Sequence, residues 1–326
     1  MRAVTVTDDR RLVVEDRPDP EPGPGEVLVR VHGAGLNRAD LVQLAGHYPA
    51  PPGSPPDIPG LEFAGEVVAL GEEVDSWTAG DRVFGIAGGG GQAELLAVPA
   101  AHCVRVPDVF DLVTAGGIPE VFVTAHDAMV TQAGATAGDT VLVHAVGSGV
   151  GTAGVQLAKA IGATVVGTAR TADKLSAARA LGLDHPVLAP RDLDVRALAD
   201  AITDAAGPVD VVLELVGGGY LAVDVRAARR GARIVVIGTL AGGRAELDVA
   251  GLMVKRLHVI GTVLRGRDHD EKAAVTAAFA RDVVPLLAAG TLAPVVAATF
   301  PIEQAPAAYE LLRSDTTFGK VILDVR

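Results

Sequence analysis

Residues 141–163 read VLVHAVGSGVGTAGVQLAKAIGA, and this stretch decides the fold. Its first residues are apolar, and Gly147, Gly149 and Gly151 follow them closely. Beyond these glycines, apolar residues recur at the spacing of one helix face, at Val155, Ala158 and Ile161. The pattern predicts a buried strand, then a tight turn, then a helix.

The predicted turn suits a phosphate group. Glycine lets the backbone approach a ligand that a Cβ would block, and the first N–H groups of a helix attract an anion. A second strand, TVVGTA at 164–169, follows at the distance usual in dinucleotide-binding folds. We therefore expect a dinucleotide here, although a plain strand-to-helix turn would show similar glycines. The expected contacts are Gly147, Ser148, Gly149, Val150 and Gly151.

The middle of the chain alternates strand and helix patterns, which is typical of a parallel sheet. Six strands are predicted, at 141–145, 164–168, 186–188, 210–215, 233–238 and 258–263. Six strands suit a complete dinucleotide-binding fold.

The residues on both sides of this sheet follow other patterns. Residues 1–120 are rich in Pro and Gly and carry short β-patterned runs. The tail is predicted to form helices over 271–289 and 303–313 and then a strand over 320–325, which should rejoin the first domain. We expect an α/β protein in which residues 121–265 are inserted into a β-rich domain made of 1–120 and 266–326.

The bulk composition excludes several classes of protein. Apolar residues make up 49% of the 326 residues and charged residues 21%, as in an ordinary globular protein. No uncharged run reaches the roughly 20 residues of a membrane span, so no membrane is expected as a partner. A net charge of −12 disfavours nucleic acid. Cys103 is the single cysteine and no signal-like segment opens the chain, so a cytoplasmic location is expected.

The residues after the second strand indicate which nicotinamide cofactor would bind. Folds specific for NAD usually carry an acid there for the ribose 2′-hydroxyl. This chain has Arg170, Thr171 and Lys174 instead, which suit a 2′-phosphate, so NADPH is expected. In the alternative interpretation, Thr171 only caps the next helix and the two cations are surface charges.

The sequence resembles a known family along nearly its whole length: the zinc-independent quinone oxidoreductases of the medium-chain dehydrogenase/reductase superfamily, in the group that includes the p53-inducible quinone oxidoreductase. The motifs that carry the resemblance are LNRADLVQLAGHYPAPPG at 36–53, PGLEFAGEVVALG at 59–71, GGGGQAELLAVP at 88–99, IPEVFVTA at 118–125, SGVGTAGVQLA at 148–158, GTVLRGR at 261–267 and FGKVILDV at 318–325. The resemblance implies a Rossmann doubly wound sheet inserted into a GroES-like catalytic domain. It also implies a homodimer or homotetramer, with HVIGTVL at 258–264 as the candidate interface strand.

The resemblance implies that no metal is needed. Zinc-using members of the superfamily have Cys, His and Cys at the positions that look like Asn37, Leu61 and Glu120 here. Asn and Leu are poor ligands, and Glu120 alone cannot hold zinc. Cys103 is expected to be a small packed residue.

The resemblance also places Asn37 and Tyr48 beside the nicotinamide, as the expected catalytic residues. Tyr48 would donate a hydrogen bond or a proton, and Asn37 would orient the ring or the substrate. Alternatively, Tyr48 is only an anchored loop aromatic and Asn37 caps a turn. Further cofactor contacts are expected at Thr124, Gly238, Thr239, Leu240, Val263, Leu264, Arg265, Gly319 and Lys320. No role is assigned to His47, His126 or His144.

These observations favour NADPH-dependent reduction of a quinone or a related conjugated carbonyl. Two alternatives stay open: an enoyl reductase that acts on an enone or an enoyl thioester, and a low-turnover NADPH-binding protein.

Overall fold

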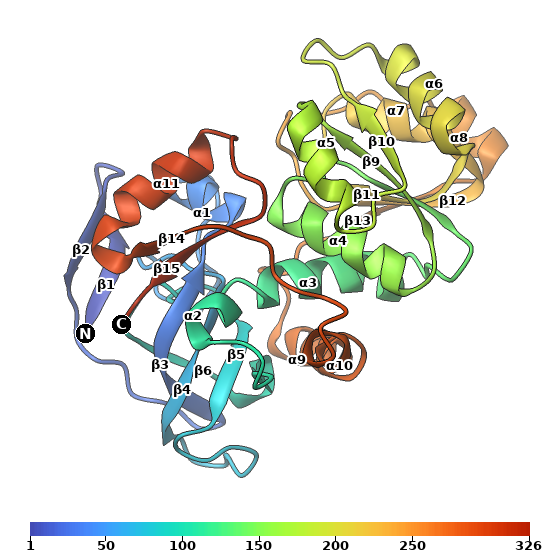
Figure 1. Ribbon diagram of the computed structural model, residues 1–326. Coiled ribbons are helices and arrows are strands. Elements are labelled where there is room, and N and C mark those ends of the chain that lie inside the picture. Colours follow the sequence, from blue (N-terminus) through green and yellow to red (C-terminus); the bar gives the residue numbers. More distant parts are fainter. The chain divides into compact units, whose positions relative to one another are not determined.

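The computed structural model describes residues 1–326, which divide into two compact units (Figure 1). The β-rich unit comprises Met1–Val123 and Leu264–Arg326, and the Rossmann unit comprises Thr124–Val263. None of the helices combines the length and the hydropathy that a bilayer crossing requires.

The Rossmann unit contains the six-stranded parallel sheet that was predicted. Its strands are β8 (Thr140–Val143), β9 (Thr164–Ala169), β10 (His185–Leu188), β11 (Val209–Glu214), β12 (Ala228–Val236) and β13 (His258–Gly261). They lie in the order β10-β9-β8-β11-β12-β13, so the chain changes direction between β8 and β11. Ligands of open parallel sheets bind at the carboxyl ends of the strands beside such a change.

Helices cover both faces of this sheet. The connecting helices are α4 (Gly149–Ala160), α5 (Ala172–Arg179), α6 (Val195–Ala206), α7 (Tyr220–Ala227) and α8 (Val249–Lys255). Because side chains alternate along a strand, Leu142, Val166 and Val212 face one way and pack with the α6 and α7 residues Leu198 and Val223. Leu213 and Val143 face the other side of the sheet. They lie against Gly154 of α4, so α4 packs on that opposite face.

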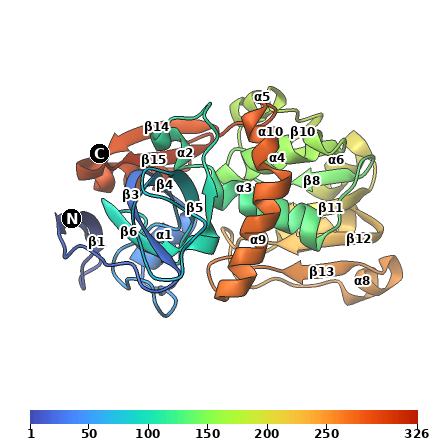
Figure 2. The ribbon, with the colours of Figure 1, turned by 90° about the horizontal axis from the view of Figure 1, so that it is seen from below.

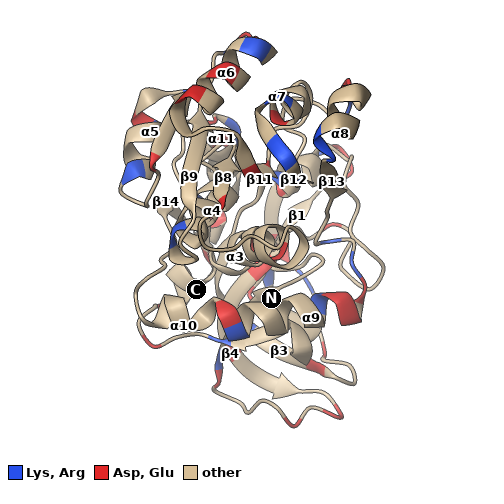
Figure 3. Ribbon diagram, turned by 90° about the vertical axis from the view of Figure 1, so that its right-hand side faces the viewer, with Lys and Arg blue, Asp and Glu red and all other residues tan.

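A sheet covered on both faces has apolar strands. Most charged residues of the Rossmann unit accordingly lie on its helices and loops (Figure 3), although β12 carries Arg229, Arg230 and Arg233. Two buried acids on β11 are exceptions: Asp210 near its start and Glu214 at its end.

The β-rich unit is built on a seven-stranded sheet in the order β14-β15-β3-β4-β5-β7, with β6 also paired to β3. These strands are β3 (Glu26–Gly35), β4 (Glu62–Leu70), β5 (Arg82–Ile86), β6 (Leu95–Pro99), β7 (Cys103–Arg105), β14 (Val296–Pro301) and β15 (Lys320–Asp324); β1 (Arg2–Val6) and β2 (Leu12–Asp16) form a separate pair. The predicted terminal strand is β15, and it pairs with β3. The tail therefore rejoins the first part of the chain.

Short helices complete the β-rich unit: α1 (Arg38–Leu44), α2 (Leu112–Ala115) and α11 (Ala305–Arg313). The helix α3 (Pro119–His126) passes from one unit to the other and continues as a π-helix over Asp127–Gln132. Cys103 is buried within the core of the β-rich unit, as expected of a packed residue.

The helix predicted over 271–289 was wrong in one respect, because two helices occupy this stretch: α9 (His269–Asp282) and α10 (Val284–Ala288) (Figure 2). Pro285 lies at the start of α10. Proline has no N–H to donate, and its ring collides with the carbonyl four residues earlier, so α9 must end before it.

Candidate active site

The glycine turn has the predicted form. Ser148 caps α4: its hydroxyl accepts a hydrogen bond from Gly151 N at 3.0 Å and donates one to Ala145 O at 2.8 Å. A Cβ at Gly151 would lie 2.3 Å from Ala145 O, so no other residue fits there without a backbone shift. The expected phosphate contacts, Gly147 to Gly151, therefore lie together at the start of α4.

The expected 2′-phosphate residues follow β9. Thr171 caps α5 and accepts a hydrogen bond from Lys174 N at 3.4 Å. Arg170 and Thr171 are exposed, Lys174 is half-buried, and the nearest acid, Asp173, lies inside the first turn of α5. The capping role of Thr171 is confirmed. Cofactor binding by this group stays a prediction.

The remaining expected cofactor residues are spread over several segments. Gly238, Thr239 and Leu240 follow β12, with Thr239 and Leu240 exposed. Thr124 lies half-buried on α3. The three consecutive residues expected near the cofactor differ in exposure: Val263 is 55% exposed, whereas Leu264 and Arg265 are buried. Gly319 is buried at φ 96°, a conformation that favours glycine, and it precedes the buried Lys320.

Asn37 lies in a buried polar network of the β-rich unit. Its side-chain amide donates to Glu62 Oε1 at 3.0 Å, and its backbone N–H donates to Asp40 Oδ2 at 2.7 Å at the start of α1. The Lys320 ammonium lies 2.6 Å from Glu62 Oε1 and donates to Asn37 Oδ1 at 2.7 Å and to Leu36 O at 2.5 Å. The structure thus brings together Asn37 and Lys320, and it adds Glu62, which the sequence analysis missed.

Glu120 is a second acid beside this network. Its backbone N–H donates to Glu62 Oε2 at 2.9 Å. Burial, and next the charge of Glu62, raise the pKa of the Glu120 carboxyl to about 8, against the opposing charge of Lys320. Glu120 is therefore protonated at neutral pH and can act as a hydrogen-bond donor.

These contacts bear on whether zinc could be held here. Leu61 is packed in the core, and Asn37 already bonds the Lys320 ammonium. The donor set contains neither thiolate nor imidazole, and an ammonium group already contacts the Asn37 and Glu62 oxygens. Such a set does not fit a tetrahedral zinc ion.

Tyr48 is fixed by Arg265. The guanidinium carbon lies 4.8 Å from the centre of the Tyr48 ring, within the range of a cation–π contact. The guanidinium donates to Tyr48 O at 2.9 Å, to Gly88 O at 2.7 Å and to Gln43 Oε1 at 2.7 Å. Arg265 therefore holds the Tyr48 loop within the β-rich unit, and its expected cofactor contact stays a prediction.

Tyr48 itself is half-buried. Burial, and next the charge of Glu120, raise the pKa of its phenol. The hydroxyl is therefore protonated at neutral pH and is able to donate a hydrogen bond. The sequence analysis identified Tyr48, but it considered Glu120 only as the position of a zinc ligand and gave no role to Gln43, which accepts a hydrogen bond from Arg265.

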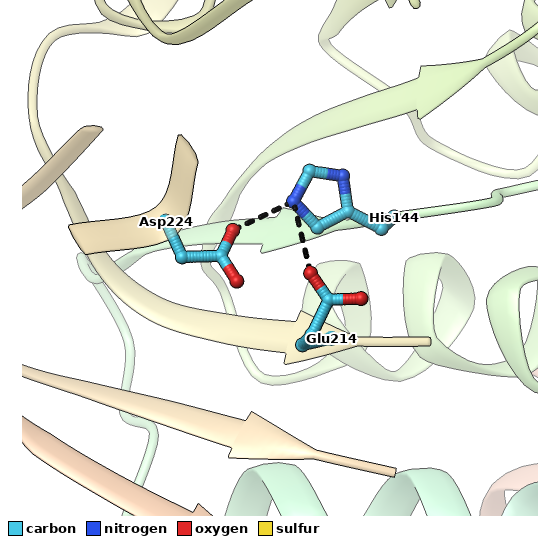
Figure 4. Close-up of side chains that lie close together, drawn as sticks. All are labelled: His144, Glu214 and Asp224. Carbon is cyan, nitrogen blue, oxygen red and sulfur yellow. Dashed lines mark hydrogen bonds and ion pairs between the residues drawn. The ribbon is translucent and has the colours of Figure 1, made fainter. Parts of the chain in front are cut away.

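In the Rossmann unit, a buried cluster surrounds His144, to which the sequence analysis gave no role (Figure 4). His144 Nδ1 lies 2.8 Å from Thr168 Oγ1, and Nε2 lies 2.8 Å from Asp224 Oδ1 and 3.8 Å from Glu214 Oε2. The three ionisable groups are fully buried, with ligand atoms within 4.8 Å of one another. This set offers three possible ligands for a cation. A tetrahedral zinc ion needs four, so the fourth ligand would have to come from outside this group.

Two family models match the chain. One, described as alcohol dehydrogenase GroES-like domain, matches residues 23–108, and the other, described as zinc-binding dehydrogenase, matches residues 149–280. Among solved structures, an NADPH complex of a mycobacterial protein has a TM-score of 0.89 at 25% identity, and an NAD-dependent alcohol dehydrogenase has a TM-score of 0.86 at 30% identity. Each comparison covers 100% of both chains.

Curated relatives fall into two kinds. The quinone oxidoreductase of Sus scrofa is 31% identical over 308 residues, which cover 93% of this chain and 90% of that protein. The spectinabilin polyketide synthase system protein NorB of Streptomyces orinoci is 35% identical over 301 residues, but these cover only 13% of the synthase protein. The chain therefore belongs to the quinone oxidoreductase group of the medium-chain dehydrogenase/reductase superfamily, and it is an oxidoreductase that depends on a nicotinamide cofactor.

Proposed function

We propose that this protein reduces quinones or related conjugated carbonyls with NADPH, by hydride transfer and without a metal ion. The observation that carries the proposal is the donor set around Lys320, which holds an ammonium group where zinc-using relatives would need metal ligands. Without a Lewis acid, the acceptor must be one that needs little activation, and a quinone or an enone takes a hydride at a conjugated position.

The chain contributes groups that can stabilise or protonate the oxyanion formed by hydride transfer. The nicotinamide cofactor supplies the hydride when it is bound. The protonated Tyr48 hydroxyl would donate to the oxygen on which charge develops, and Arg265 would keep the ring in place. Asn37 would orient ring or substrate, with its side chain fixed by Glu62 and Lys320.

An enoyl reductase is the second candidate, and one observation favours it: similarity to polyketide synthase proteins reaches 35% identity. A low-turnover NADPH-binding protein is the third. The test is an NADPH-oxidation screen with quinones, enones and enoyl thioesters. Turnover of quinones above the other two classes supports the proposal, exclusive turnover of thioesters contradicts it, and binding without turnover favours the third candidate.

The first prediction concerns the choice of cofactor. NADPH should bind at least about tenfold more tightly than NADH, a difference of roughly 1.4 kcal/mol, because Arg170, Thr171 and Lys174 suit a 2′-phosphate. Fluorescence titration of both nucleotides measures this. Arg170→Ala should remove most of the preference, whereas Arg179→Ala, an exposed arginine at the other end of α5, should leave it. Equal affinities in the wild-type protein would contradict the assignment.

The second prediction concerns metals. Treatment with a chelator should leave turnover unchanged, because Asn37, Leu61 and Glu120 do not form a tetrahedral site. Elemental analysis of the purified protein provides the control. Stoichiometric zinc together with chelator-sensitive turnover would refute metal-free catalysis.

The third prediction concerns Tyr48. Tyr48→Phe removes the hydroxyl and keeps the ring over Arg265, so enone reduction should fall by about 10²-fold. Quinone reduction should fall less, since a hydroquinone anion is stable enough to take its proton from water. Steady-state kinetics with one acceptor of each kind measure the difference. Tyr309→Phe, which deletes a hydroxyl bonded to Gln92 elsewhere in the same unit, is the matched control.

Unchanged rates for Tyr48→Phe with both acceptors would reduce Tyr48 to a packing residue. NADPH affinity should stay constant in both variants, which shows that each is folded.

The fourth prediction concerns assembly. We propose a homodimer or homotetramer that pairs through β13, because this edge strand has exposed Val259 and the preceding helix α8 has exposed Met253 and Val254. Light scattering should give a mass above that of one chain. Val259→Lys should yield monomers, since a charge on an edge strand opposes pairing. Leu188→Lys, on the opposite edge strand β10, should not. A monomeric wild-type protein would contradict the proposal.

A cytoplasmic location, which the single Cys103 favours, also stays a proposal. Localisation of a tagged chain by fractionation tests it.

A further inference from the structure

Three polar residues lie at the carboxyl ends of neighbouring strands and face the same side of the Rossmann sheet. His144 follows β8, Thr168 lies near the end of β9, and Glu214 ends β11. Each is two residues beyond a core residue that packs toward α6 and α7, namely Leu142, Val166 and Val212. Asp224 of α7 meets them there, and the Tyr220 ring packs edge-on against His144 with centres 5.0 Å apart.

Glu214 connects this cluster to the loops above β11 and β12. Its Oε1 accepts hydrogen bonds from Gly217 N, at 2.8 Å, and from Val216 N. The loop after β11 (residues 215–219) is in turn hydrogen-bonded to the loop after β12. Gly218 N donates to Gly242 O at 3.0 Å, and Ala241 N donates to Val216 O at 2.7 Å. The second loop begins with the expected cofactor residues, Gly238, Thr239 and Leu240.

His144 connects the same cluster to the glycine turn. The next residue, Ala145, has a left-handed φ of 50° and accepts the Ser148 hydroxyl. Val146 N donates to Thr168 O at 3.0 Å, and the Thr168 hydroxyl contacts His144. The cluster therefore underlies both the phosphate turn and the loops after β11 and β12.

The charges of the cluster do not balance unless it holds a proton. Glu214 Oε2 and Asp224 Oδ2 are buried and receive no hydrogen bond. Two ionised carboxylates at zero exposure would be costly, whereas one proton lets one carboxyl donate to the other. The other titratable groups facing the cluster are His144, Tyr220 and, through Tyr220, Arg170.

We propose that His144, Asp224 and Glu214 are positioning residues for the nicotinamide cofactor, and that one proton shared by the two carboxyls keeps the glycine turn and the loops after β11 and β12 in their binding conformation. The proposal rests on nicotinamide binding by this unit and adds a pH response to it.

The sign of the pH response follows from burial. Burial, and next the charge of Asp224, raise the pKa of Glu214 to about 8, and burial raises the pKa of Asp224 to about 7. Burial lowers the pKa of His144, which is therefore neutral at physiological pH. In the unfolded chain the two carboxyl groups already lose their protons at acid pH. The folded protein keeps a proton on the carboxyl pair and loses it only as the pH rises through about 7 to 8. Cofactor affinity should fall over the same range.

The test uses amide variants that mimic the shared proton. In Glu214→Gln the amide oxygen can accept from Val216 and Gly217 while the amide nitrogen donates to Asp224. Asp224→Asn is a second variant of the same kind, since its oxygen can accept from His144 while its nitrogen donates to Glu214. The control, Asp210→Asn, changes a buried acid at the opposite end of β11, where Asp210 accepts from Thr140 N at 2.8 Å.

NADPH and NADH affinities are measured by fluorescence from about pH 6 to about pH 9; NADH lacks the 2′-phosphate and so removes that group's own ionisation. In the wild-type protein and in Asp210→Asn, the Kd should rise about fivefold or more over this range. In Glu214→Gln and Asp224→Asn it should change less than about twofold and stay near the wild-type value at low pH.

Wild-type affinity that is flat with pH, or amide variants that follow the wild-type curve, would overturn the proposal. So would stoichiometric zinc in the wild-type protein that Glu214→Gln loses, since a metal would then replace the proton. Failure of the wild-type protein to bind either nucleotide would overturn the cofactor assignment together with this proposal.

Discussion

A buried ion pair between Lys320 and Glu62 connects the parts on which the candidate active site depends. Lys320 begins β15 and Glu62 begins β4, while Asn37, which bonds both side chains, starts α1. Three segments far apart in the sequence therefore meet at one ammonium group. Removing one partner of such a pair costs on the order of 3–5 kcal/mol, because the other charge is left buried and unpaired. The orientation of Asn37 depends on this pair.

The two units use their buried polar side chains in different ways. The β-rich unit buries charged and polar groups and pairs them closely, which fixes Asn37 and, through Arg265, Tyr48. The Rossmann unit also buries ionisable groups, and at the carboxyl ends of its strands Ser148 and Glu214 accept hydrogen bonds from backbone N–H groups of the following segments. The β-rich unit thus holds the candidate proton donor Tyr48, and the Rossmann unit holds the glycine turn predicted to bind the nucleotide.

The fold could be predicted because its signals are local. Alternating strands and helices, the glycines before α4 and the isolated apolar strand at 320–325 each specify structure within a short window. Pro285 was also visible in the sequence, but a helix interrupted after one residue differs little in pattern from a continuous helix. The capping by Thr171 was likewise readable. The network around Lys320 was not, since its partners are 258 and 283 residues away in the sequence, counting 320 − 62 and 320 − 37. The matching positions of His144, Thr168 and Glu214 at the ends of neighbouring strands could be read from the sequence. Their contact with Asp224 could not, because it depends on how α7 packs against the sheet.

The pairing of β15 with β3 has a consequence for the order in which the protein folds during synthesis. Domains generally fold as units as the chain emerges. All strands of the Rossmann unit lie within Thr124–Val263, so its sheet can form before the remaining residues have been made. The β-rich sheet cannot be completed at that stage, because β15 lies between β14 and β3. Until residues 320–324 emerge from the ribosome, the edge of β3 is open and Glu62 has no ammonium partner. The nucleotide-binding half of the protein can thus be finished while the half that carries Tyr48 is still awaiting its last strand.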